Sequence, residues 1–141
     1  MVATAEAAAN SAVTKLGFTA GLVVQELGYD SDVDDDLRIA IEDVIGSELE
    51  DEDYGNVADA VTLWWREDDG DLTDALVDAL TNLADRGFIV LLSPKVGRPG
   101  TVEASDIEEA ALTAGLHASG IVSASPDWTG TRLVAPKTAR R

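Results

Sequence analysis

The stretch VVQELGYDSDVDDDLR, residues 23–38, contains an apolar run, a glycine at a tight turn and a cluster of aspartates, in that order. The apolar run is part of residues 22–27, whose four aliphatic side chains predict a β-strand. Apolar residues at helical spacing follow, and the helix they predict begins at Ser31 or Asp32 and ends at Gly46. Carboxylates in a first turn accept hydrogen bonds from free backbone N–H groups and face the positive end of the helix dipole, which explains the aspartates structurally.

Strands and helices alternate along the rest of the chain. Residues 59–66 and 88–92 are runs without regular polar alternation, which is typical of strands buried on both faces of a parallel sheet. Between them, a stripe of leucines (Leu72, Leu76, Leu80 and Leu83) predicts a helix capped by Asp69 or Asp71 and ended by Gly87. The other expected elements are a helix over residues 3–16, a strand or a loop over 47–54, a loop over 95–100, a helix opened by a capping box of Ser105 and Glu108 and closed by Gly115, and a hairpin of strands 120–124 and 131–134.

This order predicts an α/β fold: a small, open, mostly parallel sheet with helices on both faces and a C-terminal antiparallel hairpin. A chain of 141 residues suffices for one hydrophobic core. We therefore divide it into an alanine-rich N-terminal helix and connector (1–20), one α/β domain (21–135) and a basic tail (136–141). No apolar run approaches the ~20 residues that span a bilayer, and the start lacks the features of a signal peptide, so we expect a cytoplasmic protein without a membrane partner.

The charge is strongly negative and unevenly distributed. The formal net charge is −17 at pH 7, and residues 1–85 hold 22 acidic and 3 basic side chains, whereas residues 86–141 hold 5 acidic and 7 basic ones. An acidic surface repels phosphate groups, so we expect no direct nucleic-acid binding. The chain has no cysteine and one histidine, and the series Asp30, Asp32, Asp34 lacks the later glycine and glutamate of a calcium-binding EF-hand loop, so we expect no metal site.

The tryptophans and the basic side chains of the C-terminal part are candidates for contacts with a partner. Trp64 and Trp65 are adjacent, so on a strand they point to opposite faces, and we expect both to pack in the core. A third tryptophan lies in the expected hairpin turn and is the better candidate for an exposed anchor. Together with basic residues whose alternative role is weak surface ion pairing, it gives our candidate set for binding a partner or an anion: Lys95, Arg98, Trp128 and Arg132.

Four segments carry a resemblance to a known family. They are GLVVQELGYD (21–30), LWWR (63–66), GFIVLLSPKVGRPG (87–100) and WTGTRLV (128–134). Together they resemble the actinobacterial Domain of Unknown Function 3052 family over nearly the whole chain, and that resemblance implies a cytosolic setting without an established activity. The order of strands and helices also resembles the class I methyltransferase fold, a Rossmann-like sheet that ends in an antiparallel strand pair.

The methyltransferase resemblance implies where a cofactor would bind. In active enzymes of that fold, the first strand leads into an acidic residue and a glycine-rich turn beside S-adenosylmethionine. Here those positions are Glu26, Gly28 and Asp30, with Asp30 in place of a second glycine and the bulky Tyr29 before it. Residues 66–69 follow the neighbouring strand, so the expected crevice is mainly negative and suits a cation or a sulfonium better than a phosphate.

We predict a non-catalytic α/β domain that binds another protein or a regulatory ligand and needs no cofactor. The glycine-rich turn is incomplete, and no recognisable motif places a nucleophile beside a base. One alternative is a methyltransferase-like enzyme that binds S-adenosylmethionine through Glu26, Gly28 and Asp30. Another is an acidic protein that imitates DNA and occupies a nucleic-acid-binding partner. A homodimer is compatible with each of these predictions.

Overall fold

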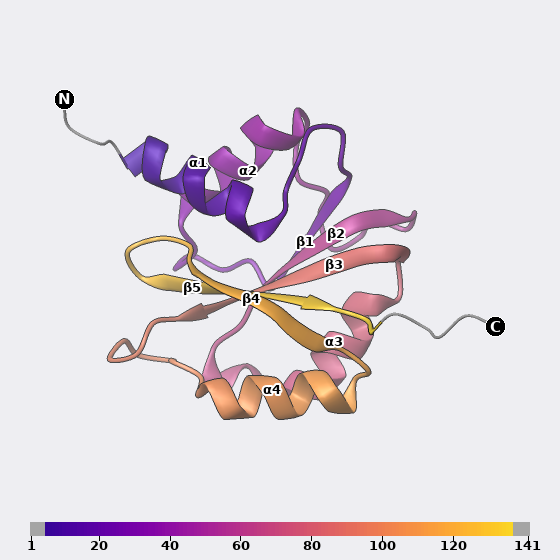
Figure 1. The fold of residues 1–141 in the computed structure, drawn as a ribbon. Coiled ribbons are helices and arrows are strands. Elements are labelled where there is room, and N and C mark those ends of the chain that lie inside the picture. Colours follow the sequence, from indigo (N-terminus) through magenta and orange to yellow (C-terminus); the bar gives the residue numbers. More distant parts are fainter. Residues whose placement is uncertain (1–4, 137–141) are drawn as a thin grey trace.

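The computed structural model describes residues 5–136, in which helices and strands alternate as the sequence predicts (Figure 1). The N-terminal helix is confirmed from Ala5 onward, whereas residues 3 and 4 and the tail beyond Pro136 lie outside the described residues. No helix within residues 5–136 has the length and apolar content needed to cross a membrane. The elements are α1 (Ala5–Leu16), β1 (Val24–Leu27), α2 (Asp35–Ile45), β2 (Ala58–Trp64), the short 3-10 helix η1 (Glu67–Asp69), α3 (Leu72–Leu80), β3 (Leu83–Pro94), α4 (Ala104–Thr113), β4 (His117–Ser123) and β5 (Trp128–Val134).

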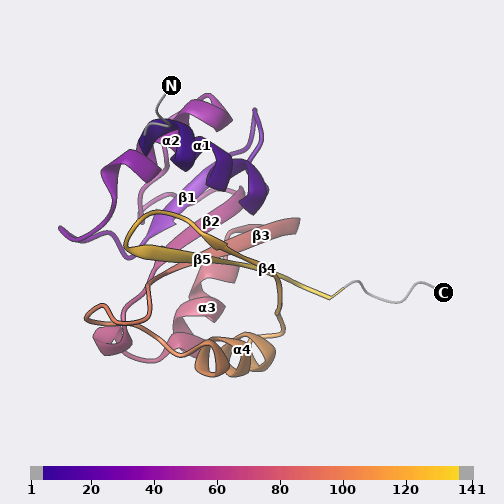
Figure 2. The ribbon, with the colours of Figure 1, turned by 60° about the vertical axis from the view of Figure 1, so that its left-hand side comes forward.

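One five-stranded sheet, in the order β1-β2-β3-β5-β4, forms the middle layer of the molecule. β1, β2 and β3 are parallel, and β5 runs antiparallel between β3 and β4. α1 and α2 cover one face of the sheet, and α3 and α4 cover the other (Figure 1 and, turned, Figure 2). The α/β fold with helices on both faces and a C-terminal antiparallel hairpin is therefore confirmed.

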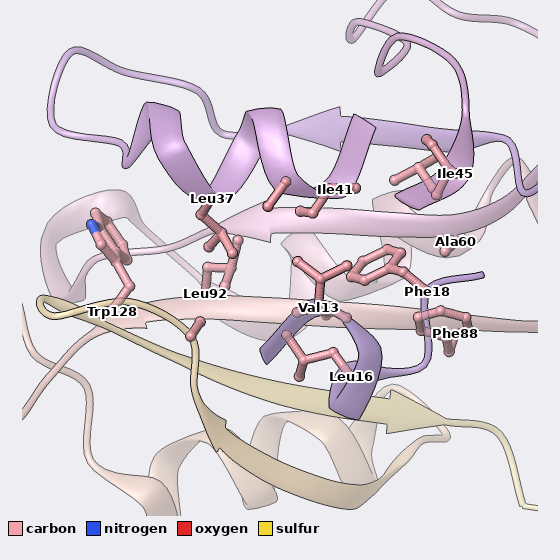
Figure 3. Packing of buried hydrophobic residues seen from close by; sticks show 14 of the residues in the cluster. Val13, Leu16, Phe18, Leu37, Ile41, Ile45, Ala60, Phe88, Leu92 and Trp128 are labelled. Carbon is pink, nitrogen blue, oxygen red and sulfur yellow. The ribbon is translucent and has the colours of Figure 1, made fainter. Parts of the chain in front are cut away.

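Each face of the sheet buries its own apolar layer. The layer under α1 and α2 extends from Trp128 to Phe88 (Figure 3). Trp64 belongs to this layer, and Trp65 belongs to the layer under α3 and α4. Both residues are buried, so the prediction that adjacent tryptophans pack on opposite faces of the sheet is confirmed.

The start of α2 is set by a cap that lies later than predicted. The helix begins at Asp35 rather than at Ser31 or Asp32. Asp34 is its N-cap, and its side chain accepts a hydrogen bond from Leu37 N at 2.9 Å. The aspartate run therefore caps the helix as expected, but only its last part lies in the first turn.

The boundary between α3 and β3 differs most from the prediction. The helix begins after Asp71, one of the two expected caps, but it ends at Leu80 rather than at Gly87. Leu83, which we assigned to the leucine stripe, already begins β3 and pairs with Ala58 of β2. The predicted end of the helix is wrong because the chain from Leu83 onward forms backbone hydrogen bonds with β2. It could not form these bonds as part of a longer helix.

The predicted cap of α4 is wrong, although its buried face is correct. Glu103 is the N-cap and makes no side-chain cap hydrogen bond, so Ser105 and Glu108 do not form a capping box. The apolar spacing therefore predicts the buried side of this helix correctly, whereas the capping pattern predicts its N-terminal boundary wrongly. The buried residues of α4 are Ile107, Ala110 and Ala111.

Residues 47–54 form a loop with a single β-bridge rather than a strand. Glu50 donates its N–H to Val24 O and accepts from Glu26 N, both at 2.8 Å, on the edge of β1 that faces away from β2. Gln25 Nε2 then donates to Asp51 O at 3.1 Å, where the chain turns back toward β2. The chain's own loop therefore covers this edge of the sheet.

Candidate functional site

β1 and β2 are neighbouring parallel strands, and the helices that follow them, α2 and α3, lie on opposite faces of the sheet. Open α/β sheets bind ligands in the crevice outside the strand ends at such a switch of direction. A hollow of about 410 Å³ lies at these strand ends. We call it the strand-end hollow, and its rim includes Tyr29, Asp30, Glu52, Trp65, Arg66 and Asp69.

Glu26 is buried at the end of β1, with 7% of its surface exposed. Its carboxylate accepts hydrogen bonds from Arg38 Nε at 2.7 Å, from Arg38 Nη2 at 2.9 Å and from Trp64 Nε1 at 3.0 Å. Because Arg38 comes from α2 and Trp64 from β2, this carboxylate joins three elements. The pKa of Arg38 is raised above its usual value, chiefly by the hydrogen bond to Glu26, so Arg38 stays charged.

Gly28 follows β1 with a φ of 78°, and its backbone lies against that of Trp64. A Cβ atom at Gly28 would lie 2.3 Å from Trp64 O, so only glycine fits this approach. Its N–H donates to Glu52 Oε2, and its carbonyl accepts from Arg66 Nη1, both at 2.9 Å. The glycine that the methyltransferase resemblance places beside a cofactor thus lies against the neighbouring strand.

Arg66 follows β2 and extends its guanidinium across the end of β1, where it binds the carbonyl of Gly28. It also binds Asp32 through Nε at 2.9 Å and through Nη2, and Asp69 through Nη1 at 3.1 Å. The guanidinium carbon lies 5.4 Å from the ring centre of Trp128. A half-buried cation therefore fills the position between the two strand ends.

The contacts of Arg66 are ionic at neutral pH. The hydrogen bond from Arg66 lowers the pKa of Asp32 below its usual value. Burial alone would lower the pKa of Arg66, but hydrogen bonds to Asp32 and Asp69 outweigh burial, and the pKa is raised. The ordinary pKa of an aspartate is about 3.9, so the ion pair with Asp32 is fully formed above that pH.

Tyr29 and Asp30 are exposed beside the strand-end hollow. The guanidinium of Arg38 lies 4.9 Å from the centre of the Tyr29 ring. Of the three predicted cofactor contacts, Glu26 and Gly28 are engaged by other parts of the protein, and Asp30 faces solvent. Within residues 5–136, no three histidine, aspartate or glutamate side chains gather closely enough to hold a metal ion.

The four C-terminal candidates do not form one cluster. Lys95 and Arg98 lie in the loop after β3, and Arg98 pairs with Asp127 of the β4–β5 turn. Arg132 lies toward the other end of β5, with its guanidinium carbon 4.5 Å from the ring centre of Phe88. Lys95 and Arg98 therefore share one loop, and Arg132 lies apart from them. The role of these three bases in binding an anion or a partner stays a prediction.

Trp128 is buried, so the prediction of an exposed anchor at this position is wrong. Only 4% of its surface is exposed, and its ring meets that of Trp64 edge-on at a centroid distance of 4.8 Å. It is the first residue of β5 and pairs with Pro94 of β3. Strand pairing therefore carries the indole into the core, although the preceding turn is exposed.

Sequence reasoning identified the strand ends but not the internal ion pairs that close them. Arg38, Asp32 and Glu52 were not recognised as contacts of this site. The available signal was the scarcity of bases: residues 1–85 hold three basic side chains against 22 acidic ones, and two of the three, Arg38 and Arg66, pair with carboxylates at the strand ends. A base in so acidic a segment is expected to find a carboxylate.

The comparisons with known sequences point to one family. A family model described as "Protein of unknown function (DUF3052)" matches residues 13–137. An uncharacterised protein of Mycobacterium tuberculosis is 48% identical over 137 residues, which cover 97% of this chain and 85% of that protein. An uncharacterised protein of Mycobacterium bovis matches with the same identity and coverage.

The comparisons with solved structures show the fold. The pyocyanin biosynthetic protein PhzM aligns with a TM-score of 0.66 at 13% identity, over 92% of this chain and 54% of PhzM. The mitomycin 7-O-methyltransferase MmcR aligns with a TM-score of 0.62 at 12% identity, over 94% of this chain, which spans 54% of MmcR. A SAM dependent methyltransferase from Aquifex aeolicus aligns with a TM-score of 0.60 at 10% identity, over 91% of this chain and 89% of that one. The fold is therefore methyltransferase-like.

Proposed function

This chain belongs to the DUF3052 family of proteins of unknown function, and we propose that it is a non-catalytic cytosolic interaction module that binds a basic segment of another protein at its strand-end hollow. One observation carries the proposal: Arg66 bridges the ends of β1 and β2 through Gly28 O and Asp32. This is the switch point at which an α/β sheet of this topology would bind a cofactor.

Two of the three residues that the resemblance assigns to S-adenosylmethionine, Glu26 and Gly28, are committed to internal contacts. A carboxylate that already accepts three hydrogen bonds, as Glu26 does, has little capacity left for a ligand. Gly28 approaches Trp64 instead of leaving its backbone open. A donor molecule would have to displace Arg66 and leave the carboxylate of Asp32 without its partner.

The composition of the strand-end hollow favours a positively charged occupant. Asp30, Glu52 and Asp78 line it beside the exposed ring of Tyr29, and all four side chains are accessible to solvent. A lysine or arginine side chain of a partner can pair with these carboxylates and contact the aromatic ring. The charge of residues 1–85 would also accelerate the approach of a basic partner, in a manner that added salt weakens.

The alternative function is that of an S-adenosylmethionine-binding enzyme. It is favoured by the hollow at the strand ends together with the methyltransferase-like fold. Identities of 10 to 13% carry no argument about activity, so this alternative rests on the hollow and the fold and not on sequence similarity.

The proposal is tested by amide NMR spectra of the labelled protein during three separate titrations, with S-adenosylmethionine, S-adenosylhomocysteine and a lysine-rich peptide. We expect no saturable shifts with either small molecule at millimolar concentration. We expect the peptide to shift the amides of Tyr29, Asp30 and Glu52, with an affinity that decreases as salt is added. Saturable shifts of Glu26 to Asp30 with S-adenosylmethionine would replace the proposal with the enzyme alternative.

A matched pair of variants separates the hollow from general charge attraction. The double variant Asp30→Asn with Asp78→Asn removes two carboxylates of the hollow. The double variant Asp85→Asn with Glu109→Gln removes two exposed carboxylates elsewhere. We expect the first to weaken binding of the peptide several-fold and the second to leave it nearly unchanged. Equal weakening in both double variants would mean that the peptide binds as a nonspecific counterion, and it would overturn the proposed site.

A further inference from the structure

The two edges of the sheet differ in how they are covered. The edge of β1 carries the bridge to Glu50, whereas within residues 5–136 no strand pairs with the outer edge of β4. β4 has the sequence HASGIVS, which lacks the lysine, carboxylate and proline side chains that commonly protect edge strands. One protective feature is present, a register shift between Ala118 and Gly120. Five of its seven residues are exposed.

An apolar groove lies beside this edge, on the face of the sheet that carries α4. It is a small cavity of about 110 Å³ between the first turn of α4, the loop after β3, and strands β4 and β5. Ile121 of β4 lines the groove and is 60% exposed, and Val96 is almost fully exposed. Leu112, also exposed, follows Glu108 of the groove by one helical turn. Apolar surface therefore adjoins unpaired strand backbone.

The charge of the surface around β4 indicates which partner can bind there. A chain with a net charge of −17 repels its own copies over most of its surface. Residues 117–136, which form β4, β5 and their turn, hold one acidic residue, Asp127, and one basic residue, Arg132. This nearly neutral surface is where two copies can approach without strong repulsion. A strand edge is also self-complementary about a twofold axis, because antiparallel strands exchange N–H and C=O groups.

We propose that two copies of this chain pair antiparallel through β4, so that the two sheets become continuous and Ile121 of each copy is buried at the interface. This interface lies at the opposite edge of the sheet from β1 and does not depend on the function of the strand-end hollow. Two adjacent copies of β4 would remove the exposed edge and cover the apolar groove beside it.

Sedimentation equilibrium of the full chain over a wide range of concentrations tests the proposal. We expect a reversible dimer of twice 14.8 kDa. Added salt should strengthen it, because salt screens repulsion between two acidic copies. This salt dependence is opposite to that expected for a basic partner at the strand-end hollow, so failure of one proposal is distinguishable from failure of the other. A wild-type chain that stays monomeric at millimolar concentration in both low and high salt would overturn the dimer.

Two variants with the same charge change locate the interface. Ile121→Lys places like charges across the twofold axis and should weaken dimerisation by about tenfold or more. Val77→Lys changes a similarly exposed aliphatic residue, 50% against 60%, on α3, and should leave the dimer intact. Far-ultraviolet circular dichroism verifies that both variants fold. A dimer that Ile121→Lys does not weaken would exclude β4.

Hydrogen exchange of the β4 amides provides an independent measurement. We expect exchange to slow as protein concentration rises into the range where the dimer forms, because the outer N–H groups become paired. Slow exchange at every concentration would mean that β4 is covered within a single copy, and it would overturn the proposal.

Discussion

Arg38 binds Glu26 through two hydrogen bonds, from Nε to Oε2 at 2.7 Å and from Nη2 to Oε1 at 2.9 Å. The indole of Trp64 donates to the same carboxylate. The position where the methyltransferase resemblance places a cofactor-binding acid is therefore occupied by an internal contact that joins β1, α2 and β2. Because this contact is internal, substitution of Glu26 should primarily lower the free energy of unfolding of the protein, rather than its affinity for a ligand.

Replacement of Glu26 by glutamine should lower the free energy of unfolding by about 2 kcal/mol, because it leaves the half-buried Arg38 without its charged partner. Urea unfolding followed by tryptophan fluorescence measures this change. The control is Asp35→Asn, which removes only a 3.4 Å contact of Arg38 at the surface and should cost less than about 0.5 kcal/mol. Equal losses in the two variants would argue against a structural role for Glu26.

Substitution of Gly28 by alanine should destabilise the protein by about 3 kcal/mol or more, since a Cβ atom there meets the carbonyl oxygen of Trp64 and adds to the cost of a positive φ. Gly46→Ala is the matched control. Gly46 also has a positive φ, but no atom lies within 4 Å of its added Cβ, so its cost should be about 1 kcal/mol. Thermal and urea unfolding distinguish the two, and indistinguishable losses would contradict the close approach of Gly28 to β2.

The sequence predicts the order of elements because apolar runs, glycines and caps are local features. The boundary between α3 and β3 is not local. Leu83 fits the leucine stripe of a helix, and its assignment to β3 depends on pairing with Ala58, which lies far away in the sequence. Trp128 is similar: the turn before it predicts exposure, but its contact with Trp64 depends on how β5 enters the sheet.

The candidate site was predictable as a position and not as a set of contacts. Topology places Gly28 and Arg66 at adjacent strand ends, and this follows from the order of strands and helices. The partners of these residues include Asp32, in the turn before α2, and Glu52, in the loop over 47–54, and no sequence pattern determines the paths of these two segments. The site therefore looked like an incomplete cofactor turn, whereas its residues bind one another.

Truncation of Trp128 to alanine should lower the free energy of unfolding by about 3 kcal/mol, because the variant leaves a cavity beside Trp64. Val96→Ala, at an almost fully exposed position of the loop after β3, should change it by less than about 0.5 kcal/mol. Urea unfolding followed by circular dichroism avoids the loss of one fluorophore. A Trp128 variant as stable as the wild-type protein would restore the interpretation of this residue as a surface anchor.

The ion pair of Asp32 with Arg66 should make a pH-dependent contribution to stability. The pKa of Asp32 is lower in the folded protein than in the unfolded chain, so folding is stabilised above the unfolded pKa of about 3.9 and loses this stabilisation as the pH falls through the folded pKa. Asp32→Asn removes the contribution. Because half of the Asp32 side chain is exposed, we expect a difference of about 0.5 to 1 kcal/mol at pH 7 that shrinks below about pH 4.

A comparison between variants is required here, since acid also relieves the repulsion among the many carboxylates of this chain and changes the stability of every form. Asp85→Asn provides it, because Asp85 is exposed and forms no ion pair in the part of the chain that the structure describes. Unfolding free energies of the wild-type protein and both variants, measured from pH 7 down to pH 3, should diverge only for Asp32→Asn at neutral pH. If Asp85→Asn were destabilised as much as Asp32→Asn at pH 7, the loss of stability would result from the change in net charge. The ion pair between Asp32 and Arg66 would then not hold the strand ends together.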